Sequence, residues 1–198
     1  MITLYGNFLS RATRCLWMLE ELGVAYKNVP VAPQEAATVA PHNPNAKVPC
    51  LVDGEYKLFE SMAINLYLAH KFGKAPFWPA SPEGLGLVYQ WSLWGATEVE
   101  PPLVAMLVEQ VFKPQGTGDA AVIANSTEKL RRPLQILDDS LVGKDWLLGE
   151  SFSAADLNLA SIVYLVDLVA YETGPFPRLR AWIDRCRNRP AWKKAHGG

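Results

Sequence analysis

Hydrophobic and polar positions follow two different periods along the chain, and the change comes part-way along it. Up to residue 73, short apolar runs typical of strands alternate with helical repeats. Runs at 2–5 and 25–31 predict strands, and the repeat over 10–23 predicts a helix that ends at Gly23. A helical crossover of this kind joins parallel strands, so we expect these two strands to be parallel.

Two more strands and a helix complete this first part. The run CLVDGEYKLF predicts two antiparallel strands joined through Asp53-Gly54, a sequence typical of a tight turn. Residues 60–73 then predict a helix that again ends at a glycine. A sheet with both a helical crossover and a tight turn must be mixed, so the sequence predicts a mixed four-stranded sheet in an α/β domain.

The remainder of the chain is helical in pattern. A long helix is expected from Glu83 with an interruption at Pro101-Pro102, and another over 119–141 with a kink at Pro133. Between the two parts lies a proline-rich stretch without periodicity, which is typical of a linker. The sequence therefore predicts an α/β domain at 1–73, a linker at 74–82 and an all-helical domain at 83–198.

Composition and charge exclude several classes of protein. Of the 198 residues, 49% are hydrophobic, and 19 basic against 20 acidic side chains give a net charge of −1. This balance provides no broad field that would attract nucleic acid or an anionic membrane. We see no transmembrane stretch or signal peptide, and three cysteines without a CxxC indicate a reducing compartment. The three histidines lack metal-ligand spacing, so we expect a cytoplasmic protein without a metal site.

The start of the helix at 10–23 is a candidate anion site. Ser10 lies in its first turn, where backbone N–H groups have no intrahelical partner and the macrodipole places positive charge. Arg11 and Arg14 add formal charge, so a thiolate held there would be stabilised and the pKa of its thiol lowered. From this segment alone, a plain N-cap role for Ser10 is the favoured interpretation.

A second set of candidates lies between residues 48 and 61. Glu60 and Ser61 open a helix, where Ser61 can donate to a carboxylate and Glu60 can accept from an ammonium group. The pair suits the head of an amino acid, although in isolation helix capping is the favoured interpretation. Pro49 opens a strand, so the backbone of Val48 could pair with an extended ligand.

These motifs, in this order, resemble those of the cytosolic glutathione S-transferases. The resemblance covers essentially the whole chain and is most specific at NPNAKVPCLVDGEYKLFES and FSAADLNLA. The stretch SRATRCLWMLEELG resembles the first helix of serine-type members, and the compact chain is similar to theta-, nu- or beta-like bacterial ones. The resemblance implies a thioredoxin-like first domain that binds glutathione as co-substrate, an all-helical second domain, and a homodimer.

The resemblance also assigns roles to the candidates. Ser10 would donate a hydrogen bond to the glutathione thiolate, which then attacks a small, hydrophobic electrophile. Val48 would pair with the cysteinyl backbone beside a cis Pro49, and Glu60 and Ser61 would hold the γ-glutamyl end.

Other positions keep two interpretations. Lys47 could meet the glycyl carboxylate or be a solvated lysine, and Arg11 could contact the ligand or face solvent. Phe8, Trp94 and Met106 would line the electrophile pocket, although such apolar residues are more often core.

One motif of the helical part is interpreted as structural. Ser153 and Asp156 have the S-x-x-D spacing of a capping box, so we expect Asp156 to serve stability rather than chemistry.

Two alternatives to a transferase stay open at this point. The first is a non-catalytic glutathione-binding or protein-interaction module of the same fold, against which the presence of Ser10, Glu60 and Ser61 argues. The second is a thiol-disulfide reductase that uses Cys15, although that thiol lies in the apolar run CLWML and is more easily explained as core. Conjugation, dehalogenation, ether cleavage, isomerisation and peroxide reduction would all use the same thiolate.

Overall fold

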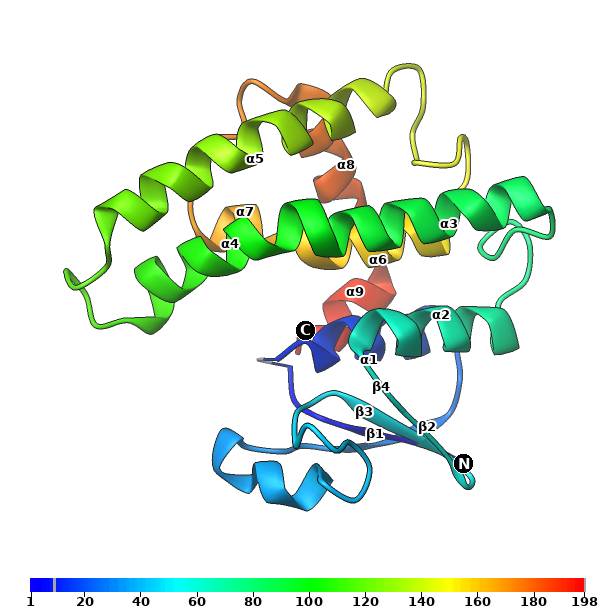
Figure 1. Ribbon diagram of the computed structural model, residues 1–198. Helices are drawn as coiled ribbons and strands as arrows, with labels where there is room; N and C mark the ends of the chain where they lie inside the picture. The colour runs from blue at the N-terminus through cyan, green and yellow to red at the C-terminus, as the bar shows by residue number, and fades with distance from the viewer. Residues whose placement is uncertain (9, 198) are drawn as a thin grey trace. The chain divides into compact units, whose positions relative to one another are not determined.

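The computed structural model describes residues 1–8 and 10–197, which fall into two compact units (Figure 1). One unit contains Met1–Ala80 and Arg187–Gly198, and the other contains Ser81–Cys186. The sequence-based division assigned everything from residue 83 onward to one helical domain. The structure instead groups the last residues of the chain with the first unit.

The first unit is built on a mixed four-stranded sheet. Its strands are β1 (Ile2–Tyr5), β2 (Tyr26–Val29), β3 (Cys50–Asp53) and β4 (Tyr56–Phe59), in the order β2-β1-β3-β4. β1 and β2 pair in parallel, whereas β3 is antiparallel to both β1 and β4. The predicted mixed sheet is therefore confirmed, with the helical crossover and the tight turn at Gly54 in their expected places.

Two helices lie side by side against this sheet, α1 (Ala12–Leu22) and α2 (Ser61–Phe72). α1 ends at Gly23 in the left-handed region, with φ 63°, as the sequence predicts. A 3₁₀ segment (Pro33–Val39) connects β2 to the loop before β3. Val39 from this segment packs with Val31 and Cys50 in a separate apolar cluster.

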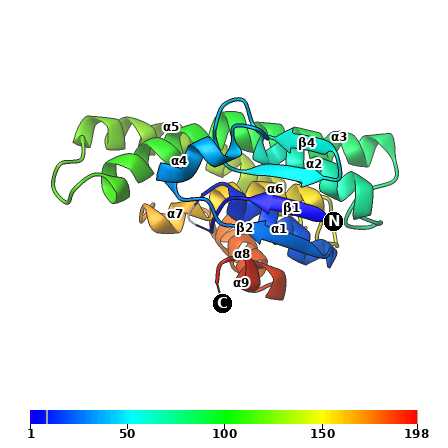
Figure 2. The same cartoon turned by 90° about the horizontal axis from the view of Figure 1, so that it is seen from below.

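The short helix α9 (Pro190–Ala195) explains why the end of the chain belongs to the first unit. The ring of Trp192 meets that of Trp17 on α1 edge to face, with centroids 4.8 Å apart. Arg189 forms an ion pair with Glu21 near the end of α1. Figure 2, seen from below, shows α9 beside α1.

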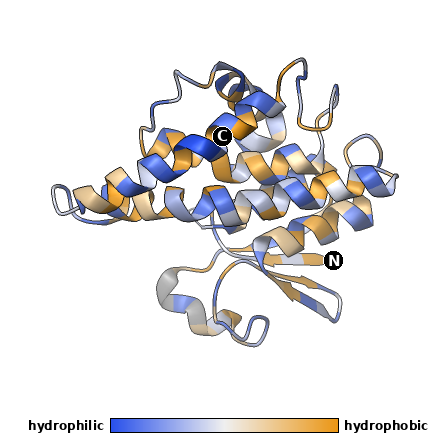
Figure 3. Cartoon of the chain, turned by 45° about the horizontal axis from the view of Figure 1, so that its top comes forward, coloured by the Kyte–Doolittle hydropathy of each residue, from blue (hydrophilic) through white to orange (hydrophobic). Residues whose placement is uncertain are grey.

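The second unit consists of helices. They are α3 (Pro82–Trp94), α4 (Glu100–Leu107), α5 (Ala120–Ser140), α6 (Ala154–Val163), α7 (Leu165–Leu168) and α8 (Pro177–Arg187). Every residue of α6 is buried, as its low charge predicts, whereas α5 is amphipathic and carries Pro133 inside it. Figure 3 shows hydrophobic and hydrophilic residues interleaved along most of these helices.

The predicted interruption at Pro101-Pro102 is wrong. The chain stays helical from α3 into α4 through a π-helical turn (Gly95–Val99), in which the Glu100 N–H bonds to the Gly95 carbonyl five residues back. The two prolines then lie in the first turn of α4. A proline lacks an N–H and its ring collides with the carbonyl four residues earlier, and the wider turn relieves both conflicts. A second π turn (Val108–Phe112) follows α4.

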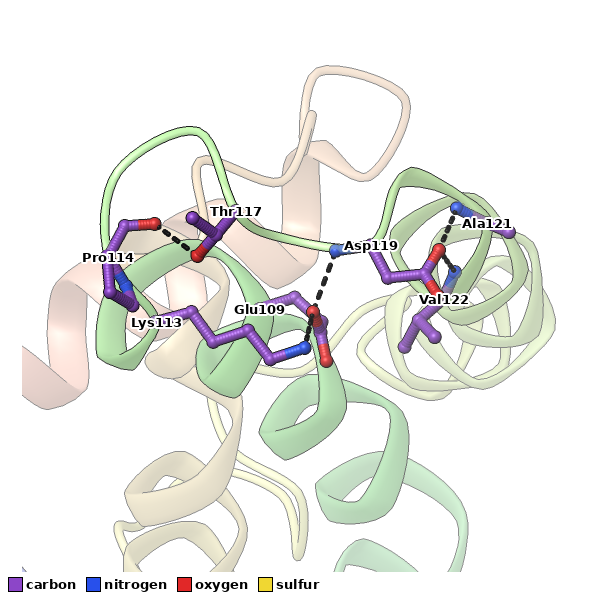
Figure 4. A network of polar contacts seen from close by, with 7 residues as sticks. All are labelled: Glu109, Lys113, Pro114, Thr117, Asp119, Ala121 and Val122. Carbon is purple, nitrogen blue, oxygen red and sulfur yellow. Dashed lines mark hydrogen bonds and ion pairs between the residues drawn. The ribbon is translucent and has the colours of Figure 1, made fainter.

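Acidic side chains cap several helices of the second unit. Asp119 accepts the Ala121 N–H at 2.8 Å at the start of α5, and Glu109 binds the Asp119 N–H at 2.8 Å and the Lys113 ammonium at 2.6 Å (Figure 4). Asp138 on α5 accepts the N–H groups of Arg178 and Leu179, which open α8.

Asp156 accepts more hydrogen bonds than the other carboxylates named here. Its Oδ2 accepts the Ser153 N–H at 3.0 Å and the Ser153 hydroxyl at 2.7 Å, which gives the capping-box contacts expected from the sequence. Its Oδ1 accepts the Leu147 N–H at 2.8 Å and the Trp182 Nε1–H at 2.9 Å. Burial raises the pKa of this carboxyl, and the four hydrogen bonds oppose that shift. One side chain thus joins the start of α6 to the preceding loop and to α8.

We expect Asp156→Ala to lower the free energy of unfolding by more than about 3 kcal/mol, because it leaves buried donors without an acceptor. Asp145→Ala, at an exposed position, is the control and should change stability by less than about 0.5 kcal/mol. Urea denaturation followed by circular dichroism measures both values. A loss below about 1 kcal/mol for Asp156→Ala would contradict the structural role of this carboxylate.

Candidate functional site

The turn from β1 to α1 is shaped by Gly6. Its φ is 141°, and a Cβ at this position would lie 2.4 Å from the Cβ of Ala12, so only glycine fits. The same point lies 3.4 Å from the Val48 Cβ and 3.6 Å from the Ser10 Oγ. Ser10 and Val48, which the sequence treats as separate candidates, are therefore neighbours.

The Ser10 hydroxyl makes two hydrogen bonds. It donates to the Asn7 carbonyl at 2.8 Å and accepts the Ala12 N–H at 3.1 Å, the second being the capping contact that the sequence favours. A hydroxyl has one hydrogen and two lone pairs. Rotation about Cβ–Oγ can therefore direct the hydrogen to a new acceptor while the oxygen continues to cap Ala12.

Val48 lies in a loop whose backbone is available for pairing. The Val48–Pro49 peptide bond is cis, as the resemblance implies. Within residues 1–8 and 10–197, neither the N–H nor the carbonyl of Val48 has a hydrogen-bond partner. An extended peptide could pair with both groups in the manner of an added strand.

Asn43 holds this loop in shape and is a residue that the sequence analysis missed. Its side chain is 3% exposed, and it donates to the Lys47 carbonyl at 2.7 Å and accepts the Asn45 N–H at 3.0 Å. The sequence signal was the Asn-Pro-Asn stretch, which is typical of a side-chain-supported turn. Asn43 therefore fixes the point from which Val48 leaves the loop.

The start of α2 combines a strained residue with a buried one. Glu60 has φ 71°, a conformation that costs a non-glycine residue roughly 1–3 kcal/mol and that is often retained at binding sites. Its side chain is exposed and makes no capping bond. Ser61 is 5% exposed, and its hydroxyl accepts a hydrogen bond from Arg14 Nη1 at 3.3 Å.

Cys15 is a core residue. Its thiol is fully buried, and its Sγ donates to the Ser61 carbonyl over 3.6 Å. Burial raises its pKa to about 12, and the charge of Arg14 offsets only part of that effect. A reductase mechanism needs an accessible thiolate, which this position does not provide.

The remaining candidates lie on both units. Lys47 and Arg11 are exposed on the first unit, as is Phe8, whose side chain is 58% exposed. On the second unit, Met106 is buried and Trp94 meets Trp91 edge to face at 5.3 Å. That these aromatic and sulfur side chains form an electrophile pocket stays a prediction.

The structure was also searched for metal and membrane features. In the described part of the chain, no three His, Cys, Asp or Glu side chains come together as metal ligands. No helix among those residues is both long and apolar enough to span a bilayer.

Comparison with known proteins identifies the family. Two family models match, the glutathione S-transferase N-terminal domain over residues 1–70 and the glutathione S-transferase C-terminal domain over residues 99–190. Glutathione S-transferase F10 of Arabidopsis thaliana is 34% identical over 205 residues, which cover 98% of this chain and 95% of that protein. The chain belongs to the glutathione S-transferase family.

Bacterial and plant members of the glutathione S-transferase family resemble it over nearly their full lengths. Glutathione S-transferase GstB of Escherichia coli K12 is 31% identical, covering 98% of this chain and 97% of that protein. The theta class glutathione S-transferase of Xanthomonas axonopodis pv. citri, solved with glutathione bound, has a TM-score of 0.90 and 30% identity over 100% and 97% of the two chains. The structure of glutathione S-transferase-I bound with lactoylglutathione has a TM-score of 0.89 and 30% identity, and the match covers 98% of each chain. The two-unit architecture with a thioredoxin-like first unit is therefore that of the glutathione S-transferases.

We expect a thiol reagent to leave all three cysteines of the native protein unmodified at pH 8. Cys15, Cys50 and Cys186 are buried, and burial raises the pKa of Cys15 to about 12 and that of Cys50 to about 11. Both thiols therefore stay protonated well above neutral pH, and unfolding in guanidinium should expose all three. Rapid modification of Cys15 in the native protein, located by peptide mass spectrometry, would revive the reductase alternative.

Proposed function

We propose that this family member is a glutathione transferase that binds glutathione on its first unit and activates the thiol for attack on an electrophilic, hydrophobic small molecule. The observation that supports this most is the proximity of Ser10, at the start of α1, to Val48, whose backbone is unpaired within the described residues. A peptide paired with Val48 would bring its own thiol close to the Ser10 hydroxyl.

The chemistry requires only that the thiolate be favoured over the thiol. Glutathione loses its thiol proton to solvent, and the Ser10 O–H turns from the Asn7 carbonyl to donate to the sulfur. Lowering a thiol pKa by two units takes about 2.7 kcal/mol, within reach of one charge-assisted hydrogen bond beside a helix start. The sulfur lone pair then forms a bond to the electrophilic carbon, and a leaving group or a π bond takes the displaced electron pair.

The other candidate residues would hold the ends of the co-substrate. Val48 with cis Pro49 would pair with the cysteinyl backbone, Glu60 would accept from the γ-glutamyl ammonium, and Ser61 would donate to its carboxylate. The exposed side chains Lys47 and Arg11 would lie near the remaining carboxylate and the thiolate. Contacts of Phe8, Trp94 and Met106 with the electrophile are proposed from the family resemblance alone.

A non-catalytic glutathione-binding module is the second candidate function. The same loop, the same helix starts and a serine that only caps would support it, since Ser10 caps Ala12. The two functions differ in one respect, which is whether the pKa of bound glutathione is lowered.

The experiment that separates them is an ultraviolet titration of bound glutathione in the wild type and in Ser10→Ala. We expect the bound thiol to ionise at least roughly one pH unit below free glutathione, and the substitution to abolish the shift. The rate of conjugation to an aryl halide should fall by about a hundredfold or more, with little change in glutathione affinity. If the wild type binds glutathione without a lower thiol pKa, the non-catalytic module is favoured. If it does not bind glutathione at all, both proposed functions are contradicted.

We further propose that the protein is a homodimer in the cytoplasm. The second unit exposes Leu87 and Leu93 on α3, close in sequence to Trp94, which borders a groove of about 680 Å³ between helices of that unit. A second copy of the chain would remove these apolar side chains from water.

Sedimentation equilibrium should give about twice the monomer mass of 21.9 kDa, and Leu93→Glu should give the monomer because it buries a charge in the interface. Leu168→Glu, at another exposed leucine of this unit, is the control and should remain dimeric. A wild type that stays monomeric at high concentration would contradict the proposal.

A further inference from the structure

Asn7 joins the turn between β1 and α1 to the segment that follows β2. Its side-chain amide donates from Nδ2 to the Val31 carbonyl at 2.9 Å. Beside this contact, a backbone hydrogen bond of 2.9 Å joins the Gly6 N–H to the Val29 carbonyl. The asparagine side chain therefore extends the pairing of the two segments by one link beyond the ends of the strands.

The backbone of the same residue holds Ser10. The Asn7 carbonyl accepts the Ser10 hydroxyl at 2.8 Å and the Ser10 N–H at 3.2 Å. When the hydroxyl turns to a ligand, the carbonyl keeps the N–H, so this turn is not left with an unpaired acceptor. Asn7 therefore holds Ser10 in the same place whichever way the hydroxyl points.

Val31, which anchors the Asn7 side chain, is also a packing partner of the Val48 loop. Val31 is 4% exposed and belongs to the apolar cluster of the first unit, against which the Val48 side chain packs. Close-packed side chains resist displacement. The positions of Ser10, by way of Asn7, and of Val48 are therefore both set by one packed cluster.

We propose that Asn7 is a positioning residue that fixes the Ser10 hydroxyl relative to the Val48 backbone, so that a peptide paired with Val48 brings its thiol to a donor already in place. The proposal rests on the transferase function proposed above and adds a residue that the family motif did not include. Asn7 acts through Ser10 and not through contact with the sulfur. A reacting group displaced by about 1 Å can lose roughly a hundredfold in rate, so loosening this turn weakens thiol activation while Val48 still binds the peptide.

The first test separates thiol activation from binding. Asn7→Ala removes the bond to the Val31 carbonyl. In the ultraviolet titration, the variant should lose at least about half of the wild-type lowering of the bound thiol pKa, and kcat with an aryl halide should fall by about tenfold. Calorimetry with S-methylglutathione, which has no thiol to activate, should show a change in affinity of less than about threefold. Asn28→Ala, at an exposed position of β2, is the matched control and should alter none of these quantities.

A double-mutant cycle tests whether Asn7 acts through Ser10. In the Ser10→Ala background, Asn7→Ala should change kcat by less than about twofold, because the hydroxyl that Asn7 positions is already absent. A residue needed only for folding would instead lower kcat by the same factor in both backgrounds. Asn7→Gln keeps an amide donor in the turn, so it should retain more of the thiol pKa shift than Asn7→Ala.

Two results would overturn the proposal. One is a full thiol pKa shift in Asn7→Ala, and the other is an equal loss of kcat in the wild-type and Ser10→Ala backgrounds. Failure of the proposed function is seen separately, in the wild type alone. If the wild type does not lower the pKa of bound glutathione, the transferase function fails, and the role of Asn7 fails with it.

Discussion

The close approach of the Gly6 backbone to the start of α1 is the constraint on which the candidate site depends. With 2.4 Å between a notional Cβ and that of Ala12, the turn leaves no room for a side chain, and this lets Ser10 and the Val48 loop meet at one point. The loop in turn is held by Asn43, and the Ser10 hydroxyl by Asn7 and Ala12. Ser10 and Val48 have small side chains, and the backbone around them sets their positions.

The two units differ in the acidic side chains at their helix starts. In the second unit, Asp119, Asp138 and Asp156 supply negative charge or acceptors to the starts of α5, α8 and α6. In the first unit, the described first turns of α1 and α2 carry no acidic side chain, and Glu60 at the N-cap of α2 is exposed and makes no capping bond. Aspartate side chains thus complete these helix starts in the second unit, and under the proposed function the carboxylate of the ligand would do so at α2.

The sequence predicted features that depend on neighbouring residues. The strands, the Asp53-Gly54 turn, the left-handed Gly23 and the Ser153–Asp156 spacing each follow from a few adjacent positions. The course of the chain at Pro101-Pro102 was mispredicted because the π turn that accommodates the prolines has no local signature. The burial of Arg14 and the pairing of Arg14 with Ser61 join residues 47 positions apart, so no pattern within either helix could reveal them. The family motif predicted Ser10, Val48 and Ser61 as candidate site residues, but it gave no account of what orients them.

The return of α9 to the first unit has a consequence for the order in which the protein is made. Trp17 is buried at the middle of α1, and its edge-to-face partner Trp192 lies close to the other end of the chain. The helix α1, which follows Ser10, therefore keeps part of its core uncovered while the second unit is being synthesised. Domains commonly fold as they emerge from the ribosome, but the core of this unit is completed only after Trp192 has been made. A chain that stops before residue 192 lacks this aromatic contact, so Trp17 would lose part of its cover.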